Sequence, residues 1–290
     1  MVLQLLAGGL SIGAVYAMIA IGFTLLWQTS RTINFAQGEF ITFPAFFMVL
    51  FVVVLKMPYV LALVSTILVA ILFLGFVIRR TLIQALMERG GMLPIVIATI
   101  ALSLLIRNAF LRFWTSTGLT FEPIVGQEPI QLGRMIFSSL DLCNVLIAAS
   151  MITSLQLFVR RTKPGKALQA VAQNRESARI IGINVARMIT LAFIINAALT
   201  AMAAILIAPI YLVKYDMGVE LGLKAFYSAI IGGFNQVRGA LVGGLILGVA
   251  ESLTAAYLST EYKVVIVLVI LIAVILIKPE GLLGTKEEGI

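Results

Sequence analysis

The sequence predicts an all-α, polytopic bundle of membrane-spanning helices. Of the 290 residues, 61% are hydrophobic and 12% are charged, whereas a soluble domain carries about 25% charged residues. So little polar surface cannot cover a globule in water. The basic residues cluster at the ends of long apolar runs, which is typical of membrane proteins and not of a nucleic-acid-binding face. We expect a single transmembrane domain over residues 1–290.

About eight stretches, one of them interrupted, are apolar enough to cross a bilayer as helices, which takes roughly 20 residues each. In chain order they are Leu5–Trp27, Phe40–Leu55, Met57–Ile78, Gly90–Ile106, Met135–Val159, Met188–Val213, Ala225–Ala250 and Val264–Ile277. The first 30 residues contain no charged side chain, whereas a cleaved signal peptide begins with a basic region. We therefore expect the first stretch to be a genuine span.

Turns and polar segments separate these spans. The second span, Phe40–Leu55, is short, and we expect it to extend backward through Asn34–Glu39. A tight turn at Lys56-Met57-Pro58 leads into the third span, which ends at Arg79-Arg80. The segment Trp114–Gly133 is polar and rich in proline and glutamate, so we expect a loop outside the membrane.

The distribution of Lys and Arg predicts the orientation of the spans. Twelve of the 21 basic residues lie in Arg79–Gly90, in Arg160–Arg187 and in the tail after Ile277, whereas six lie in the loops and helix ends of the opposite side. Loops beside spans that carry such an excess stay in the cytoplasm. We therefore expect a periplasmic N-terminus and a cytoplasmic C-terminus.

Two interruptions fall within or beside apolar runs. Ala225–Val237 and Gly239–Ala250 are each too short to span, and a Gly-, Asn- and Gln-containing break at Asn235–Gly239 separates them. A similar polar interruption occurs at Gln28–Glu39. Irregular backbone at membrane depth is stable only against protein or a wet cavity, and broken helices of this kind are typical of a transporter's pathway.

Seven polar residues in or near these runs are therefore candidates for a substrate pathway. They are Asn34, Gln37, Glu39, Asn196, Asn235, Gln236 and Glu251. Polar groups at membrane depth are costly and face a bundle interior or a cavity. The alternative role for the same residues is structural, as helix caps and interhelical hydrogen bonds. Glycines that recur four residues apart, such as Gly9 and Gly13, favour close helix packing over the lining of a conduit.

The segment Arg160–Arg187 is the longest stretch of high charge density, with seven of the 21 basic residues and one acid, Glu176. Pro164 suits a first helical turn, Asn174 can N-cap a second helix over Arg175–Ile181, and Gly182 can end it. We expect two short cytoplasmic helices here.

This basic loop is a candidate docking surface for a soluble intracellular partner. The residues that we expect to take part are Gly165, Lys166, Arg175, Glu176, Ala178, Arg179, Ile181 and Gly182. We expect the second helix to expose Ala178, Ile181 and Ile183 beside Arg175 and Arg179, an apolar contact with a charged rim. The alternative is a helix that lies on anionic lipid.

The composition argues against an enzyme. Histidine is absent and Cys143 is the single cysteine, which excludes His-based catalysis, His metal ligation and Cys-rich metal sites. No P-loop motif occurs, so we expect no ATP site of that kind in this chain. We accordingly predict no catalytic residues, no metal site and no cofactor bound by the chain itself.

Four strings spread over nearly the whole chain resemble the branched-chain amino-acid ABC permeases of the LivH type. They are INFAQGEF at Ile33–Phe40, ARIIGINV at Ala178–Val185, IGGFNQVRG at Ile231–Gly239 and KPEGLLG at Lys278–Gly284. One departure is Gln37, where we expect many relatives to carry histidine, so a protonation role at that position does not carry over.

The resemblance implies one of two permease subunits of a bacterial inner-membrane importer. It further implies a second, similar and usually longer permease, two cytoplasmic ATPase subunits that hold ATP and Mg, and a periplasmic binding protein that delivers the substrate. Membrane lipid is the remaining expected partner, and nucleic acid is not expected.

Two alternatives to branched-chain or related hydrophobic amino acids stay open. Urea or short-chain amides are the same-family alternative. A secondary carrier without an ATPase would need a buried ion or proton site, and the scarcity of mid-membrane acids, essentially Glu39 and Glu251, argues against it. The sequence identifies neither the side chain carried nor whether the permease pairs with itself or with a different chain.

Overall fold

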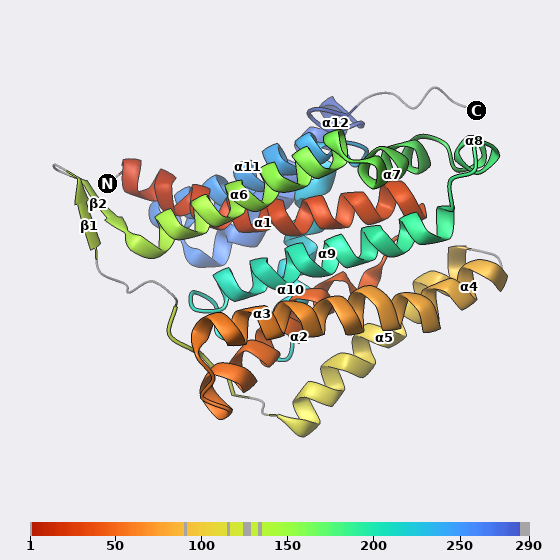
Figure 1. The fold of residues 1–290 in the computed structure, drawn as a ribbon. Coiled ribbons are helices and arrows are strands. Elements are labelled where there is room, and N and C mark those ends of the chain that lie inside the picture. The colour runs from red at the N-terminus through yellow and green to blue at the C-terminus, as the bar shows by residue number, and fades with distance from the viewer. Residues whose placement is uncertain (1, 90–91, 115–116, 124–128, 133–134, 285–290) are drawn as a thin grey trace. The chain divides into compact units, whose positions relative to one another are not determined.

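The computed structural model describes residues 2–89, 92–114, 117–123, 129–132 and 135–284. Eight helical segments of this described part are long and apolar enough to cross a membrane, which confirms the predicted all-α membrane bundle (Figure 1). They are Val2–Ser30, Phe35–Val54, Tyr59–Leu86, Leu93–Phe113, Ser139–Arg161, Val185–Ile207, Val237–Tyr257 and Thr260–Ile277. The chain divides into two compact units, a first unit of residues 1–24, 122–151 and 223–290 and a second unit of residues 25–121 and 152–222.

The second unit is built around helix α9. Its complete elements are the 3₁₀ turn Phe35–Gly38, α2 (Glu39–Val49), the π-helical turn Leu50–Val54, α3 (Tyr59–Ala70), the π-helical segment Ile71–Ile83, α4 (Gln84–Arg89), α5 (Met92–Phe113), α7 (Lys163–Gln173), α8 (Arg175–Ile180) and α9 (Val185–Ile207). Helix α9 packs against α2, α3 and the π-helical segment that continues α3 (Figure 1). The second span begins at Phe35, so the predicted backward extension from Phe40 is confirmed.

Aromatic residues fill the core of the second unit. The rings of Phe46 on α2 and Phe110 on α5 stack with their centroids 4.4 Å apart, and Phe40 lies 6.3 Å from Phe193 of α9. Phe40, Phe46 and Phe193 are fully buried. Between membrane-spanning helices, close van der Waals packing of this kind, rather than removal of the rings from water, stabilises association. These contacts hold α2 in place, and α2 follows directly on the turn that carries Asn34 and Gln37.

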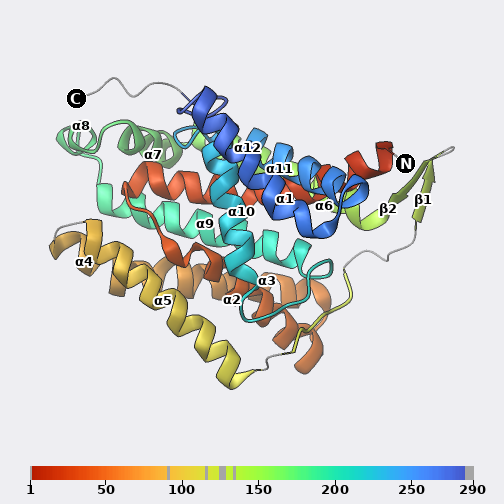
Figure 2. The ribbon, with the colours of Figure 1, turned by 180° about the vertical axis from the view of Figure 1, so that it is seen from behind.

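The first unit contains β1 (Pro129–Leu132), β2 (Met135–Ser138), α11 (Val237–Tyr257), a 3₁₀ turn at Thr260–Tyr262 and α12 (Lys263–Ile277). Helices α11 and α12 pack side by side (Figure 2). The first part of α1 (Val2–Ser30) approaches α11 through glycines. A Cβ atom on Gly13 would come within 2.9 Å of the Gly244 carbonyl oxygen, so the backbones touch and the predicted glycine packing is confirmed at this contact.

Helix α6 (Ser139–Arg161) begins later than the predicted span Met135–Val159. Residues 135–138 pair instead with residues 129–132 as an antiparallel hairpin, with Met135 opposite Leu132. The hairpin satisfies their backbone groups outside the helix. Part of the segment Trp114–Gly133 is therefore a strand rather than a loop.

The prediction of two short apolar pieces within Ala225–Ala250 is wrong. Helix α11 has 21 residues and is long enough to span by itself, and α10 (Met217–Gly232) begins eight residues before Ala225. The charges of Lys224 and Glu251 did not end these helices because they pair with each other, at 3.1 Å between Lys224 Nζ and Glu251 Oε1.

Candidate functional site

Gln37 and Asn196 form a buried, reciprocal amide pair in the second unit. Gln37 Nε2 donates to Asn196 Oδ1 and Asn196 Nδ2 donates to Gln37 Oε1, both at 3.0 Å. Gln37 is 4% exposed and Asn196 is fully buried. The 3₁₀ turn positions Gln37, and the middle of α9 positions Asn196. The pair links two elements that are far apart in sequence through side-chain hydrogen bonds. Its amides could present both donors and acceptors to a small polar group.

Glu39 lies two residues after Gln37, at the start of α2. Ser103 of α5 donates to Glu39 Oε1 at 2.9 Å. The second carboxyl oxygen, Oε2, is buried and makes no hydrogen bond within the part of the chain that the structure describes. Burying a carboxyl group without full pairing is expensive, so this side chain is a strained feature of the same unit as the amide pair.

Asn34 has a local structural role. Its Oδ1 accepts a hydrogen bond from the Ala36 backbone N–H at 3.0 Å and so caps the 3₁₀ turn. The Phe35 N–H donates to Thr99 Oγ1 of α5 at 3.2 Å. The turn that presents Gln37 is thereby fixed at its start by a cap and by α5.

Glu251 belongs to a different cluster, in the first unit. It accepts from the Tyr16 hydroxyl at 2.8 Å through Oε2 and pairs with Lys224. Lys224 Nζ also donates to the Tyr16 hydroxyl at 3.1 Å. The three buried side chains come from α1, α10 and α11. Sequence reasoning missed Tyr16 and Lys224, although an acid and a base on adjacent apolar helices are a signal for pairing.

Asn235 and Gln236 lie half-buried in the turn between α10 and α11. The C-terminal tail closes this turn, because the N–H groups of Leu282 and Leu283 donate to the carbonyls of Ile231 and Gly232 at 2.8 and 2.9 Å. The turn therefore lies where the span α12 ends. The interpretation of Asn235–Gly239 as a break between two half-spans is wrong.

The basic loop forms the two predicted helices, α7 and α8. Asn174 Oδ1 accepts from the Ser177 N–H at 2.9 Å and N-caps α8, as predicted. Gly182 adopts a left-handed backbone with φ +85°, and the Ile183 N–H closes the helix on the Ala178 carbonyl at 3.0 Å. Helix α8 ends at Ile180, one residue before the predicted end.

Arg175 anchors this loop to the end of α1 within the second unit. Its Nε donates to the Thr29 carbonyl at 2.9 Å, and Arg31 Nη2 reaches the Ala172 carbonyl at 3.3 Å. Burial lowers the pKa of Arg175, and the positive charges of Arg31 and Arg179 lower it further. Two arginines therefore hold the loop to the end of the helix.

The loop residues do not all reach the surface. Ala178 is 2% exposed, which contradicts the expectation that α8 presents it, because it faces inward beneath the helix. Gly165 is also buried, whereas Lys166, Glu176, Arg179, Ile181 and Gly182 are exposed. The apolar tip is instead Ile180 and Ile181, which are 85% and 72% exposed. Sequence reasoning missed Ile180. Its place next to Ile181, as a second large apolar residue in a basic loop, could have identified it as part of the exposed tip.

The described part of the chain combines eight candidate membrane-spanning helices with buried polar clusters between helices and an exposed basic loop, which is the architecture of a multi-pass membrane protein. The family model described as "Branched-chain amino acid transport system / permease component" matches residues 5–275, and the chain belongs to this family. It is a multi-pass membrane protein.

Curated relatives match along nearly the whole chain. The chain is 33% identical to the high-affinity branched-chain amino acid transport system permease protein LivH of Salmonella typhimurium, over 98% of this chain and 96% of that protein. It is 32% identical to the permease protein BraD of Pseudomonas aeruginosa, with the same coverage of both chains. A probable LivH protein of Methanocaldococcus jannaschii is 27% identical, over 97% of this chain and 92% of its own length. No solved structure matches the chain.

Proposed function

We propose that this chain is the permease subunit of an ATP-binding-cassette importer that carries branched-chain or related hydrophobic amino acids across the bacterial inner membrane. The observation that carries the proposal is the family match over residues 5–275, supported by full-length relatives whose names specify branched-chain amino acid transport. The energy comes from ATP hydrolysis in partner subunits, which hold ATP and Mg.

The exposed tip of α8 is the proposed docking point for an ATPase subunit. Ile180 and Ile181 stand out into water beside the exposed charges of Glu176 and Arg179. An apolar centre with a polar rim is the usual composition of a protein interface. The remaining partners are a second permease, a second ATPase and a periplasmic binding protein. The arginine contacts to Thr29 and Ala172 give docking at this loop a direct connection to the end of α1.

The proposed orientation places the N-terminus outside and the C-terminus inside. Eight crossings alone would return the C-terminus to the side of the N-terminus. Helix α10 lies between two of the spans and has 16 residues, or about 24 Å of helix, close to the roughly 30 Å of a hydrocarbon core. The orientation therefore requires α10 to act as a ninth, shorter crossing.

The proposed pathway follows the amide pair of Gln37 and Asn196 together with Glu39. A hydrophobic amino acid needs only a few polar groups for its ammonium and carboxylate along an otherwise apolar route. These three side chains are buried in one unit, and Asn196 on α9 is distant in sequence from the neighbouring Gln37 and Glu39. Asn235 and Gln236 are weaker candidates because they lie in a turn at the end of a span.

The test is uptake by proteoliposomes that contain this permease together with its proposed ATPases, second permease and binding protein. We expect leucine uptake that requires ATP. The ATP must be on the side of the vesicle membrane that the ATPases face. Uptake of urea or acetamide without uptake of leucine would instead identify short amides as the substrate class. Uptake driven by an ion gradient in the absence of the ATPases would establish a secondary carrier and overturn the proposal.

A further inference from the structure

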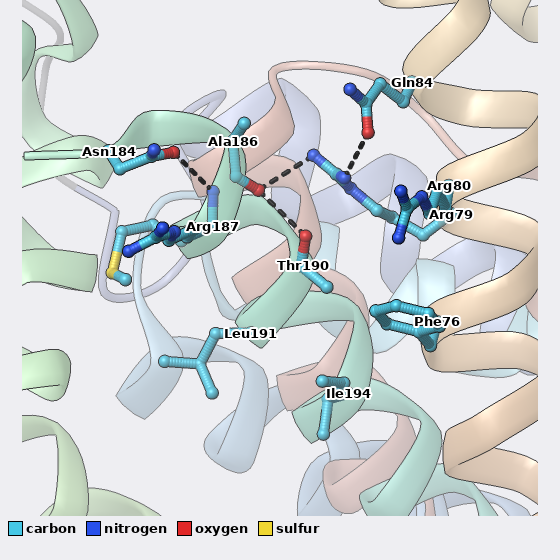
Figure 3. Close-up of a pocket in the computed structure, with 11 residues that line it drawn as sticks. Phe76, Arg79, Arg80, Gln84, Asn184, Ala186, Arg187, Thr190, Leu191 and Ile194 are labelled. Atoms are coloured by element: carbon cyan, nitrogen blue, oxygen red, sulfur yellow. Dashed lines mark hydrogen bonds between the residues drawn. The ribbon is translucent and has the colours of Figure 1, made fainter.

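An open groove of about 620 Å³ lies in the second unit, between the end of the π-helical segment and the first turns of α9 (Figure 3). Arg79 holds the two walls together. It is 6% exposed, and its guanidinium donates to Gln84 Oε1 at 2.7 Å and to the Ala186 carbonyl at 2.8 Å. The groove is therefore a built feature, in which one arginine fixes the distance between two helices.

The mouth of the groove is positively charged. Arg80 lies on one wall and Arg187 on the other, and both are exposed. The Arg80 guanidinium rests 5.9 Å from the centre of the Phe76 ring, which orients it along the wall. None of the lining residues that the structure describes is acidic. In Figure 3 the Arg187 side chain extends away from Arg80, so a shared ligand would draw both exposed, flexible side chains toward the mouth. Guanidiniums favour a phosphate or carboxylate as that ligand.

The floor of the groove is apolar and runs into the membrane-spanning parts of both helices. Leu191 and Ile194 lie one and two turns beyond Arg187 along α9, and Phe76 lies one turn before Arg80. Seven residues of helix extend about 10 Å, so the floor descends that far into the span. Phe76 is 41% exposed and Leu72, further along the same segment, is 63% exposed. This outer surface suits contact with hydrocarbon.

We propose that this groove binds one anionic phospholipid, with its phosphodiester between Arg80 and Arg187 and an acyl chain along Phe76, Leu191 and Ile194. A basic pocket between membrane helices at the water boundary is the expected site for an anionic head group. Free phosphate would use the mouth and gain nothing from the apolar floor. A protein partner is a less suitable occupant, because the apolar floor of the groove lies within the membrane spans. The proposed docking point for a protein is the exposed Ile180–Ile181 tip.

The groove's chemistry does not depend on what the permease carries. It rests on the proposed orientation only in the choice of leaflet, which would be the cytoplasmic one, on the side of the basic loop. Failure of the transport proposal would leave this lipid site intact, and loss of lipid binding would leave the transport proposal intact.

The experiment measures lipid retained by the purified full-length chain in native mass spectrometry, after incubation with phosphatidylglycerol or phosphatidylcholine of the same acyl composition. The test variants are Arg80→Gln, Arg187→Gln and the double variant. The matched control is Arg161→Gln, which removes an exposed arginine at the end of α6 outside the groove. We expect selective retention of phosphatidylglycerol, weakened about five-fold by each groove variant and about thirty-fold by both, and little changed by the control.

Two further measurements keep the test decisive. The variant Ile194→Asn should weaken lipid binding while the mouth stays charged, and inorganic phosphate at equal concentration should not displace the lipid. The double Arg80→Lys, Arg187→Lys variant, which keeps both charges, should retain most of the binding if the groove is folded. The proposal would be overturned if the Arg161→Gln control lost as much lipid binding as the groove variants, or if phosphate alone displaced the lipid. It would also be overturned if the groove variants lost ATPase co-purification while their lipid retention stayed unchanged.

Discussion

The triad of Tyr16, Lys224 and Glu251 places a formal ion pair inside an apolar helix bundle. Removing one partner of a buried ion pair costs about 3–5 kcal/mol, because the other charge stays buried alone, whereas replacing both by apolar groups can be nearly neutral. The Tyr16 hydroxyl contacts both partners, donating to Glu251 and accepting from Lys224. The triad therefore joins α1, α10 and α11 as a unit.

Lys224→Met and Glu251→Leu should each lower the thermal unfolding temperature of the detergent-solubilised chain. The double variant should be more stable than either single one, since it leaves no unpaired charge. Unfolding followed by fluorescence-detected gel filtration checks this. Strictly additive losses would show that the two charges do not depend on each other.

Asn196→Leu and Gln37→Leu separate a pathway role from a structural one. Each single change leaves one buried amide without its partner, at a cost of about 1–3 kcal/mol, and should also reduce leucine uptake. The double Leu variant should recover stability because both amides are gone. If the amides contact substrate, uptake stays low in the double variant. Recovered uptake would assign the pair a purely structural role.

At the scale of elements, the α8 tip is the part of the loop that a partner can reach. Ile180→Asp with Ile181→Asp should abolish co-purification of the ATPase and substrate-stimulated ATP hydrolysis, because an apolar interface centre contributes about 2 kcal/mol or more per key residue. Ser177→Ala, on the same helix and exposed, is the matched control and should change both by little. Unchanged hydrolysis in the Asp variant would exclude the tip as the coupling contact.

The end of α8 supplies a second prediction at this scale. Gly182 has φ +85°, and a Cβ atom there would have no heavy atom within 4 Å. Space is therefore not the constraint, and backbone strain alone decides which residues fit. Gly182→Asn should preserve coupled ATP hydrolysis, since Asn tolerates the left-handed region, whereas Gly182→Val should impair it. Equal rates of coupled ATP hydrolysis in the two variants would show that the left-handed residue at position 182 does not position α8.

At the scale of the whole molecule, α10 decides the topology. Single cysteines at Thr120, Ser177 and Thr260 in a Cys143→Ala background can be labelled in intact cells with an impermeant maleimide. If α10 crosses the membrane, Thr120 and Thr260 are labelled and Ser177 is not. Labelling of Thr120 alone would place the α11–α12 connection inside and remove α10 from the set of crossings. Labelling of Ser177 without Thr120 would reverse the whole orientation.

The sequence predicted the spans and the two-helix loop because hydrophobicity, caps and glycine stops act locally. Asn174 and Gly182 were assigned correctly for that reason. The failures involve contacts between distant residues. Lys224 and Glu251 appeared to interrupt apolar helices until their pairing was seen, and Ala178 could not be assigned to the inner face of α8 without the packing beneath it. The amide pair joins residues 159 positions apart, a distance that no local pattern reports.

The closure of the α10–α11 turn by Leu282 and Leu283 has a consequence for biosynthesis. The carbonyls of Ile231 and Gly232 receive their donors from residues made about fifty positions later, which at typical ribosomal speeds is roughly 3–10 s. A nascent or prematurely terminated chain therefore exposes an unfinished helix end. A chain cut before Leu282 would lack both donors, so these carbonyls at the end of α10 would need other hydrogen-bond partners.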